Sequence, residues 1–170
     1  MWPHKWTVIH PHELNVITFR KLEEADFELL LNWLQQPHVK EWWDDGDDTI
    51  TKVKSHYTKD ADTVTRFILL SDNKEPVGYF QYYVERCGVI GIDQFLGDVS
   101  LINKGLGTKA VMAFSKLIRE TKQPTTIIVD PEPENHRAIR CYEKAGFLFE
   151  QIEIGKDGKQ AYIMRMETNV

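Results

Sequence analysis

Apolar and polar residues alternate with two different periods along the chain, and the period indicates which segments are strands. Residues 16–20 alternate in steps of two, with Ile17 and Phe19 on one face, and the same period returns near the C-terminus. An apolar, β-branched run at 125–129 is typical of a buried strand. The segments that we expect to be strands are 16–20, 65–70, 76–85, 90–97, 125–129, 147–154 and 160–166.

Four other segments carry apolar residues at helical spacing, as at Phe27, Leu30 and Leu34. Thr49 is placed to cap the second of these helices, and Gly146 is placed to end the last one. The helices that we expect are 24–34, a short one following Thr49, 105–119 and 135–145.

The order of these elements, β-α-α-β-β-β-α-β-α-β-β, implies a sheet with helices on its faces. Residues 71–75 favour a turn, and Asp157-Gly158 is a hairpin signal, so the strands that flank each of them are expected to pair antiparallel. The sequence therefore predicts an α+β (α/β) fold. Its central sheet is mixed and mostly antiparallel, with about seven strands flanked by about four helices.

The composition is that of one globular domain. The chain has 170 residues, 42% of them hydrophobic and 28% charged, which is enough to bury a core. We expect a single domain over 1–170, with 1–14 as an N-terminal extension. No apolar run is long enough to span a bilayer, the start does not resemble a secretory signal, and the two cysteines lack metal-ligand spacing. The expectation is a cytoplasmic protein without a metal.

The net charge of −5 disfavours a nucleic-acid partner and mildly favours a neutral or cationic one. The acids are unevenly spread, because five of them crowd around Trp42 and Trp43. One interpretation is a solvated loop whose tryptophans enter the core; the other is the rim of a pocket for a cationic molecule. The clustered acids are Glu41, Asp44, Asp45, Asp47 and Asp48.

Glycines interrupt the chain between a predicted strand and a predicted helix, at Gly105-Leu106-Gly107. The amides of such a turn, together with the first amides of the helix, can bind a pyrophosphate, and Lys104 and Lys109 add positive charge. The spacing is neither GxGxxG nor that of a Walker A loop. A plain tight turn remains the alternative interpretation.

Residues 99–108 resemble the acetyl-CoA loop of the GNAT superfamily of N-acetyltransferases, and Asn135 to Phe147, ending in Tyr-Glu-Lys-Ala-Gly-Phe, resembles its second motif. Ile102 departs from the Gln or Arg usual at that loop position. The resemblance covers nearly the whole chain and implies acetyl-CoA as the acetyl donor. It places the coenzyme against Phe95, Leu96, Val99, Lys104, Gly105, Leu106, Gly107, Thr108, Asn135, Ala138 and Lys144.

A narrower resemblance points to the aminoglycoside 6'-N-acetyltransferases. It is carried by Glu41-Trp42-Trp43, by residues 91–96 (Gly-Ile-Asp-Gln-Phe-Leu) and by Asp130-Pro131-Glu132-Pro133. Acyltransferases for lysine-derived siderophore precursors or peptide amines share the tryptophan-rich first half. The stretch 82–89 is short, whereas some of the drug-modifying enzymes carry a longer acidic insertion there. This difference bears on the identity of the acceptor more than on the class of reaction.

Within this resemblance, Asp93 is the candidate base that deprotonates the acceptor amine, and Tyr142 is the candidate acid that protonates the departing thiolate. A strand-end aspartate bonded to backbone amides and a tyrosine packed in the core are the structural alternatives. Asn135 can bond the pantetheine arm of the coenzyme, although the residue pattern by itself favours a cap of its own helix. The acceptor is expected to contact Trp42, Trp43, Asp45, Asp93, Gln94 and Asp130.

These residues imply an acetyl-CoA-dependent N-acetyltransferase that transfers acetyl directly to a small cationic amine, the 6'-amine of an aminoglycoside. The alternatives are acylation of a siderophore precursor or peptide amine, and an inactive CoA-binding module. We expect no nucleic-acid or membrane partner, and either a monomer or a homodimer.

Overall fold

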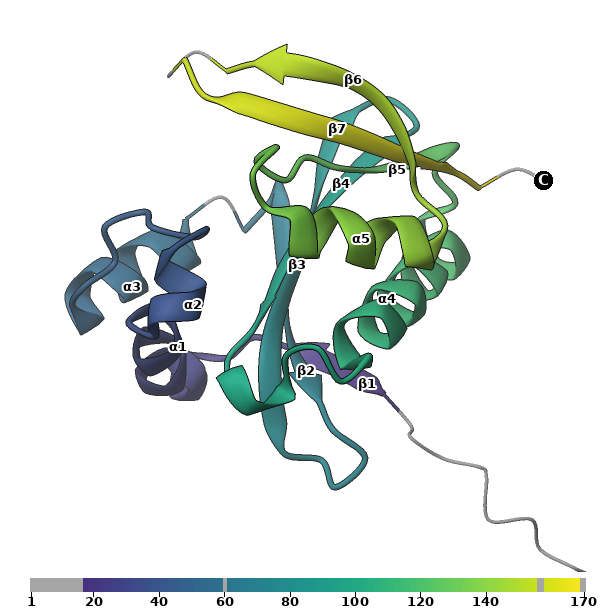
Figure 1. Cartoon of the computed structure of the whole chain (residues 1–170). Helices are drawn as coiled ribbons and strands as arrows, with labels where there is room; N and C mark the ends of the chain where they lie inside the picture. Colours follow the sequence, from purple (N-terminus) through teal and green to yellow (C-terminus); the bar gives the residue numbers. More distant parts are fainter. Residues whose placement is uncertain (1–16, 60, 156–157, 169–170) are drawn as a thin grey trace, which may run out of the picture.

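The computed structural model describes residues 17–59, 61–155 and 158–168 of the chain. These residues form one seven-stranded sheet with five α-helices around it (Figure 1). The strands are β1 (Thr18–Lys21), β2 (Val64–Leu70), β3 (Pro76–Arg86), β4 (Val89–Leu96), β5 (Thr126–Val129), β6 (Leu148–Ile154) and β7 (Gln160–Glu167). The helices are α1 (Phe27–Leu34), α2 (Pro37–Lys40), α3 (Ile50–Thr58), α4 (Leu106–Lys122) and α5 (His136–Ala145), with 3-10 helices η1 (Glu24–Asp26) and η2 (Val99–Leu101).

The strands are ordered β1-β2-β3-β4-β5-β7-β6, and each neighbouring pair is antiparallel except β4 and β5, which are parallel. The prediction of a mixed, mostly antiparallel sheet is therefore confirmed. Helices α1, α2 and α3 lie on one side of the sheet, and α4 and α5 lie on the other (Figure 1). Among the described residues, no helix combines the length and the apolar character that crossing a bilayer requires.

The alternation of side chains along β3 gives the sheet an apolar core on each face. Phe80 and Tyr82 pack with Phe114 of α4 in one cluster, whereas Tyr79 packs with Leu30 of α1 in the other. Tyr79 and Phe80 are both fully buried. Burial of one large apolar side chain contributes about 2 kcal/mol, so both faces of β3 stabilise the fold.

Strands β4 and β5 diverge after a short parallel pairing. The pairs run from Val89 and Thr126 to Gly91 and Ile128. Beyond Gly91, β4 has no strand partner on this side within the described residues, although β3 pairs with it as far as Leu96 on the other side. Backbone amides and carbonyls of an unpaired strand need hydrogen-bond partners, so this edge is where a ligand can pair with the sheet.

Both ends that the sequence predicts for helices are confirmed. Thr49 Oγ1 accepts a hydrogen bond of 3.3 Å from the Lys52 amide and caps α3. Gly146 ends α5 with a left-handed φ of 99°, a conformation that favours glycine. The helix expected over 105–119 continues to Lys122.

The helix expected over 24–34 is interrupted, because residues 24–26 form the 3-10 helix η1 and only the rest is α-helical. The cause is Asp26. It accepts hydrogen bonds of 2.6 and 2.7 Å from the Arg20 guanidinium and one of 2.9 Å from the Glu23 amide. The carboxylate thus joins the start of this helix to β1, a contact that apolar spacing does not reveal.

The sequence analysis missed α2 and η2, which are too short to show a hydrophobic period. Pro37 stands at the start of α2, where its missing N–H costs nothing, and Val39 anchors the turn in the core. The expected extension at 1–14, the start of the first strand at Val16 and Asp157 of the hairpin signal lie outside the described residues.

Candidate active site

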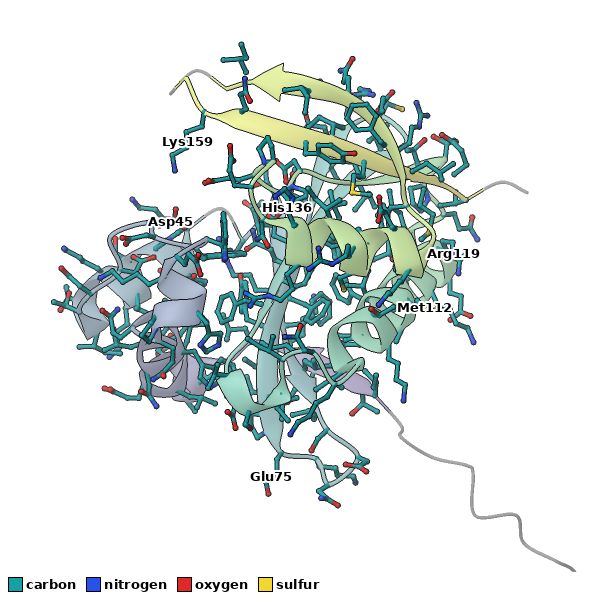
Figure 2. The ribbon with its side chains drawn as sticks, in the orientation of Figure 1. Asp45, Glu75, Met112, Arg119, His136 and Lys159 are labelled. Carbon is teal, nitrogen blue, oxygen red and sulfur yellow. The ribbon has the colours of Figure 1, made fainter. Side chains whose placement is uncertain are left out.

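A cavity of about 590 Å³ opens where β4 and β5 diverge. Its wall is formed by α2 and the following loop, the end of β4, the glycine loop before α4, the segment after β5, and α5. Figure 2 places Asp45 on the α1–α3 side of the molecule and His136 at the start of α5. Neither of these two residues lines the cavity itself, but its lining runs from His38 to Lys144, so residues far apart in sequence contribute to one concave site, as is usual for small-molecule binding.

Asp93 of β4 lines this cavity. Its Oδ2 accepts a hydrogen bond of 2.8 Å from Gln81 Nε2, a side chain rather than the backbone amides of a capping aspartate. Burial disfavours the charged form and raises the pKa of Asp93 to about 7, and the nearby Asp130 carboxylate adds to this rise. A carboxyl group with a pKa near neutrality is suited to accept a proton from an amine.

Tyr142 projects from α5 into the same cavity and is 7% exposed. Burial is the largest cause of a pKa well above the ordinary value, with the Asp93 carboxylate adding to it, so the hydroxyl keeps its proton. Gln94 Nε2 donates a hydrogen bond to the Tyr142 oxygen. Because Gln94 supplies the donor in this contact, the Tyr142 proton remains available for donation, as a general acid requires.

The glycine loop has the backbone geometry of an anion site. Gly105 adopts a φ of 80° directly before α4, and a side chain there would meet nothing within 4 Å, so conformation and not space favours glycine. The first hydrogen bond of α4 in this turn runs from the Lys109 amide to the Gly105 carbonyl. The amides of residues 106–108 precede that ladder and can bind phosphate oxygens.

The coenzyme side of the cavity continues from this loop to α5 and the free edge of β4. Phe95 and Leu96 line it on that edge, where an extended chain can add as a further strand. Asn135 Oδ1 accepts a hydrogen bond of 3.1 Å from the Ala138 amide, so the expected helix cap is confirmed. Asn135 also lines the cavity, and its amide carries an Nδ2 donor group besides the oxygen that caps the helix.

The acceptor side is acidic and aromatic. Asp130 lies in the wall beside Asp93, and burial together with the carboxylates of Glu85 and Glu153 raises its pKa, although cavity solvent still reaches it. Trp43 packs edge-on against Phe95, with 5.2 Å between ring centroids. Carboxylates and aromatic faces together are suited to a cation.

Most of the residues proposed from sequence line this one cavity. They are Trp42, Trp43, Asp93, Gln94, Phe95, Leu96, Gly105, Gly107, Thr108, Asp130, Asn135, Ala138, Tyr142 and Lys144. Four others lie outside its wall, namely Asp45, Val99, Lys104 and Leu106. Val99 is 62% exposed on η2, and Asp45 lines a smaller neighbouring pocket of about 180 Å³.

Around that smaller pocket, ligand atoms of Asp45, Asp47 and His56 lie within 4.8 Å of one another. Asp47 Oδ2 is already bound to His56 Nδ1 at 2.6 Å, which links the acidic loop to α3. The acidic run is therefore partly structural, and its other members face solvent.

Two polar contacts of the site were missed by sequence reasoning. His38 of α2 lines the cavity and its Nε2 lies 3.0 Å from the Leu96 carbonyl oxygen. Gln81 holds Asp93 across the strand pair. Neither contact has a sequence motif. The contact of Gln81 depends on the register of β3 and β4, and the contact of His38 depends on a helix as short as α2.

Comparison with known proteins agrees with this geometry. The family of acetyltransferase (GNAT) domains matches residues 23–153. The aminoglycoside N(6')-acetyltransferase type 1 of Klebsiella pneumoniae is 37% identical over 166 residues, which span 88% of this chain and 82% of that protein.

Solved structures of AAC(6')-Ib superpose closely on the chain. A complex that contains acetyl-CoA has a TM-score of 0.82 at 38% identity and covers 89% of this chain and 93% of that one. A complex with coenzyme A and kanamycin gives the same score and identity, over 89% and 95% of the two chains. The chain therefore belongs to the GNAT acetyltransferases, in the family of the aminoglycoside N(6')-acetyltransferases.

Proposed function

We propose that this protein transfers acetyl from acetyl-CoA directly to the 6'-amine of an aminoglycoside. The observation that carries the proposal is the pairing of a buried carboxyl group of raised pKa, Asp93, with a protonated buried hydroxyl, Tyr142, in one cavity. Relatives named for this activity cover most of the chain, which favours it over acylation of a siderophore precursor or peptide amine.

The residues on the coenzyme side fit acetyl-CoA. The left-handed turn at Gly105 and the amides of residues 106–108 would hold the pyrophosphate. The free edge of β4 would pair with the extended arm, and Asn135 would donate to it. When bound there, acetyl-CoA supplies the thioester whose acetyl group is transferred.

The chain's own groups would move the protons of this reaction. Asp93 would accept the proton of the acceptor ammonium, directly or through water, and the freed amine would form the new N–C bond. Tyr142 would donate its hydroxyl proton to the sulfur as the C–S bond breaks, and the second proton that the amine loses on becoming an amide would restore the Tyr142 hydroxyl. A backbone amide of the β4 edge would stabilise the negative charge that develops on the carbonyl oxygen.

On the acceptor side, Asp130 would pair with an amino group, and Trp42 and Trp43 would pack against the sugar rings. Asp45 and Gln94 complete the proposed contacts. Gln94 lies in the wall of the cavity, and Asp45 would reach the acceptor from the smaller pocket beside it. A substrate with several ammonium groups fits this arrangement better than a monoamine does. We place the reaction in the cytoplasm, where acetyl-CoA is available, with the protein acting as a monomer or homodimer.

The test is thiol release from acetyl-CoA in the presence of a panel of amines. We expect rapid release with kanamycin or tobramycin and no release with an aminoglycoside that carries a hydroxyl in place of the 6'-amine. Mass spectrometry of the product should show one added acetyl group. Release with lysine or a peptide amine but with no aminoglycoside would contradict the proposed acceptor and preserve the reaction class.

A further inference from the structure

One face of β3 carries a row of polar side chains that ends at the proposed base. Tyr79, Gln81 and Tyr83 alternate onto this face, and the strand register places Gln81 directly opposite Asp93 of β4. Tyr79 is fully buried among the rings of Tyr57, Trp43 and Phe95. Its hydroxyl therefore has a fixed position.

Two hydrogen bonds connect Tyr79 and Gln81 of this row to Asp93 of β4. The Tyr79 hydroxyl donates to Gln81 Oε1 at 2.6 Å, and Gln81 Nε2 donates to Asp93 Oδ2 at 2.8 Å. The guanidinium of Arg66, a group that only donates, lies near the Tyr79 hydroxyl. With a donor beside its oxygen, Tyr79 directs its own proton to Gln81, and the Gln81 amide is left with its NH₂ group facing Asp93.

Resting on the proposed function, we propose that Gln81, held by Tyr79, is a positioning residue that binds Asp93 Oδ2 and leaves Oδ1 to accept the amine proton. Gln81 touches no reacting atom in this arrangement; it acts through Asp93. The contact also favours the ionised form of Asp93, because a fixed N–H donor stabilises a carboxylate.

The Gln81 hydrogen bond changes the pKa of Asp93 in the opposite direction from its other surroundings. Burial, Asp130 and Asp45 all raise the pKa of Asp93, and the Gln81 hydrogen bond lowers it. The other titratable groups whose charges interact with Asp93 are the hydroxyls of Tyr79, Tyr83 and Tyr142. All three lack a charge near neutral pH, so loss of the Gln81 donor should shift the titration of Asp93 upward by about one pH unit.

The experiment measures the titration of Asp93 itself by carbon-13 NMR of the side-chain carboxyl, with the signal assigned through Asp93→Asn. We expect the midpoint to rise in Gln81→Met, and to rise further in Gln81→Glu, which replaces the donor by a second carboxylate. Tyr79→Phe should give a smaller rise. Tyr82→Phe is the matched control, since Tyr82 packs on the opposite face of β3.

Kinetics supply a second readout. In Gln81→Met, the acid limb of the kcat–pH profile should move upward by the same amount, with the Kd for acetyl-CoA changed less than twofold. Thermal unfolding checks that each variant is folded. An unchanged NMR midpoint in folded Gln81→Met overturns the inference, as does a shift of equal size in Tyr82→Phe. If no amine is acetylated but the midpoint shifts, the proposed function fails and with it the catalytic meaning of the contact, whereas the effect of Gln81 on the titration of Asp93 stands.

Discussion

Asp93 and Gln94 are consecutive residues of β4 whose side chains serve opposite faces of the sheet. Asp93 bonds Gln81 on the face toward α1–α3, and Gln94 donates to Tyr142 of α5 on the other face. Because β4 is unpaired on its β5 side here, both side chains still line the same cavity. Strand β4 thus carries the proposed base, Asp93, and next to it the residue that binds the proposed acid, Tyr142.

Replacing the base should remove most of the turnover while leaving the coenzyme side intact. Asp93→Asn keeps the size of the side chain and can still accept a hydrogen bond from Gln81. We expect kcat to fall roughly 10²- to 10⁴-fold, the usual contribution of a general base. The Kd for acetyl-CoA, measured by calorimetry, should stay within about twofold. A kcat near that of the native chain would exclude Asp93 from proton transfer.

The same substitution should stabilise the fold at neutral and higher pH. The pKa of Asp93 is raised to about 7, so between pH 4 and pH 7 the folded chain binds a proton that the unfolded chain releases. Stability from this group is therefore present at low pH and lost as pH rises through about 7. At pH 8, Asp93→Asn should unfold with a free energy about 4 kcal/mol higher than the native chain. The gain should vanish below pH 4; denaturant titrations at both pH values would show whether it does.

Tyr142→Phe removes the hydroxyl that we assign as the acid. The departing thiolate would then leave without its proton, so kcat should drop roughly 10- to 100-fold. Stability should fall by about 1–2 kcal/mol, because Gln94 loses its acceptor in a buried site. Tyr162→Phe on β7 is the control, since Tyr162 does not line the cavity. A kcat near that of the native chain in Tyr142→Phe would exclude the hydroxyl as the acid, and equal losses of kcat in the two variants would indicate a general effect on the fold.

The glycine loop offers a test with a closely matched control. Gly105→Ala forces a side chain into a φ of 80°, and Gly158→Ala does the same at 81° in the β6–β7 hairpin, both in open space. Each should cost about 1 kcal/mol of stability through backbone strain. The Kd for acetyl-CoA should rise severalfold in Gly105→Ala only. A similar rise in both variants would remove the loop from coenzyme binding.

Asp130 should influence both the acceptor and the base. Asp130→Asn removes a carboxylate beside Asp93, so the acid limb of the kcat–pH profile should move downward, opposite in sign to the effect of Gln81→Met. The KM for a polyamine acceptor should rise about fivefold and depend less on salt. An acid limb that moves upward would contradict the electrostatic account of this site.

The sequence alone is sufficient to predict the regular part of this fold. Long periodic segments such as α4 and the cap at Thr49 depend on local chemistry and were predicted correctly. Asp93, the proposed base, could be identified from sequence because its carboxyl group interrupts an apolar strand. Its partner Gln81 did not stand out, since a glutamine on a strand has no signal until the register shows what lies opposite.

Errors arose where a tertiary contact overrides local preference. Asp26 turns the expected start of a helix into η1 because it holds Arg20 of another element. Asp45 was expected to contact the acceptor together with its acidic neighbours, and the structure places it in the smaller pocket that shares Trp43 with the cavity, so its contact with the acceptor stays a prediction. Neighbours in sequence indicate charge density; they do not show on which side of a tryptophan each carboxylate lies.

In the part of the chain that the structure describes, three residue pairs, Val89–Gly91 with Thr126–Ile128, join β4 to β5. The sheet therefore consists of two blocks, β1–β4 and β5–β7, that share a short seam and are covered together by α4 and α5 (Figure 1). A small bend at this seam would change the width of the cavity that opens between β4 and β5. A coenzyme bound along β4 would restrict this bend. Binding of the coenzyme before the acceptor would therefore fix the width of the cavity into which the acceptor binds.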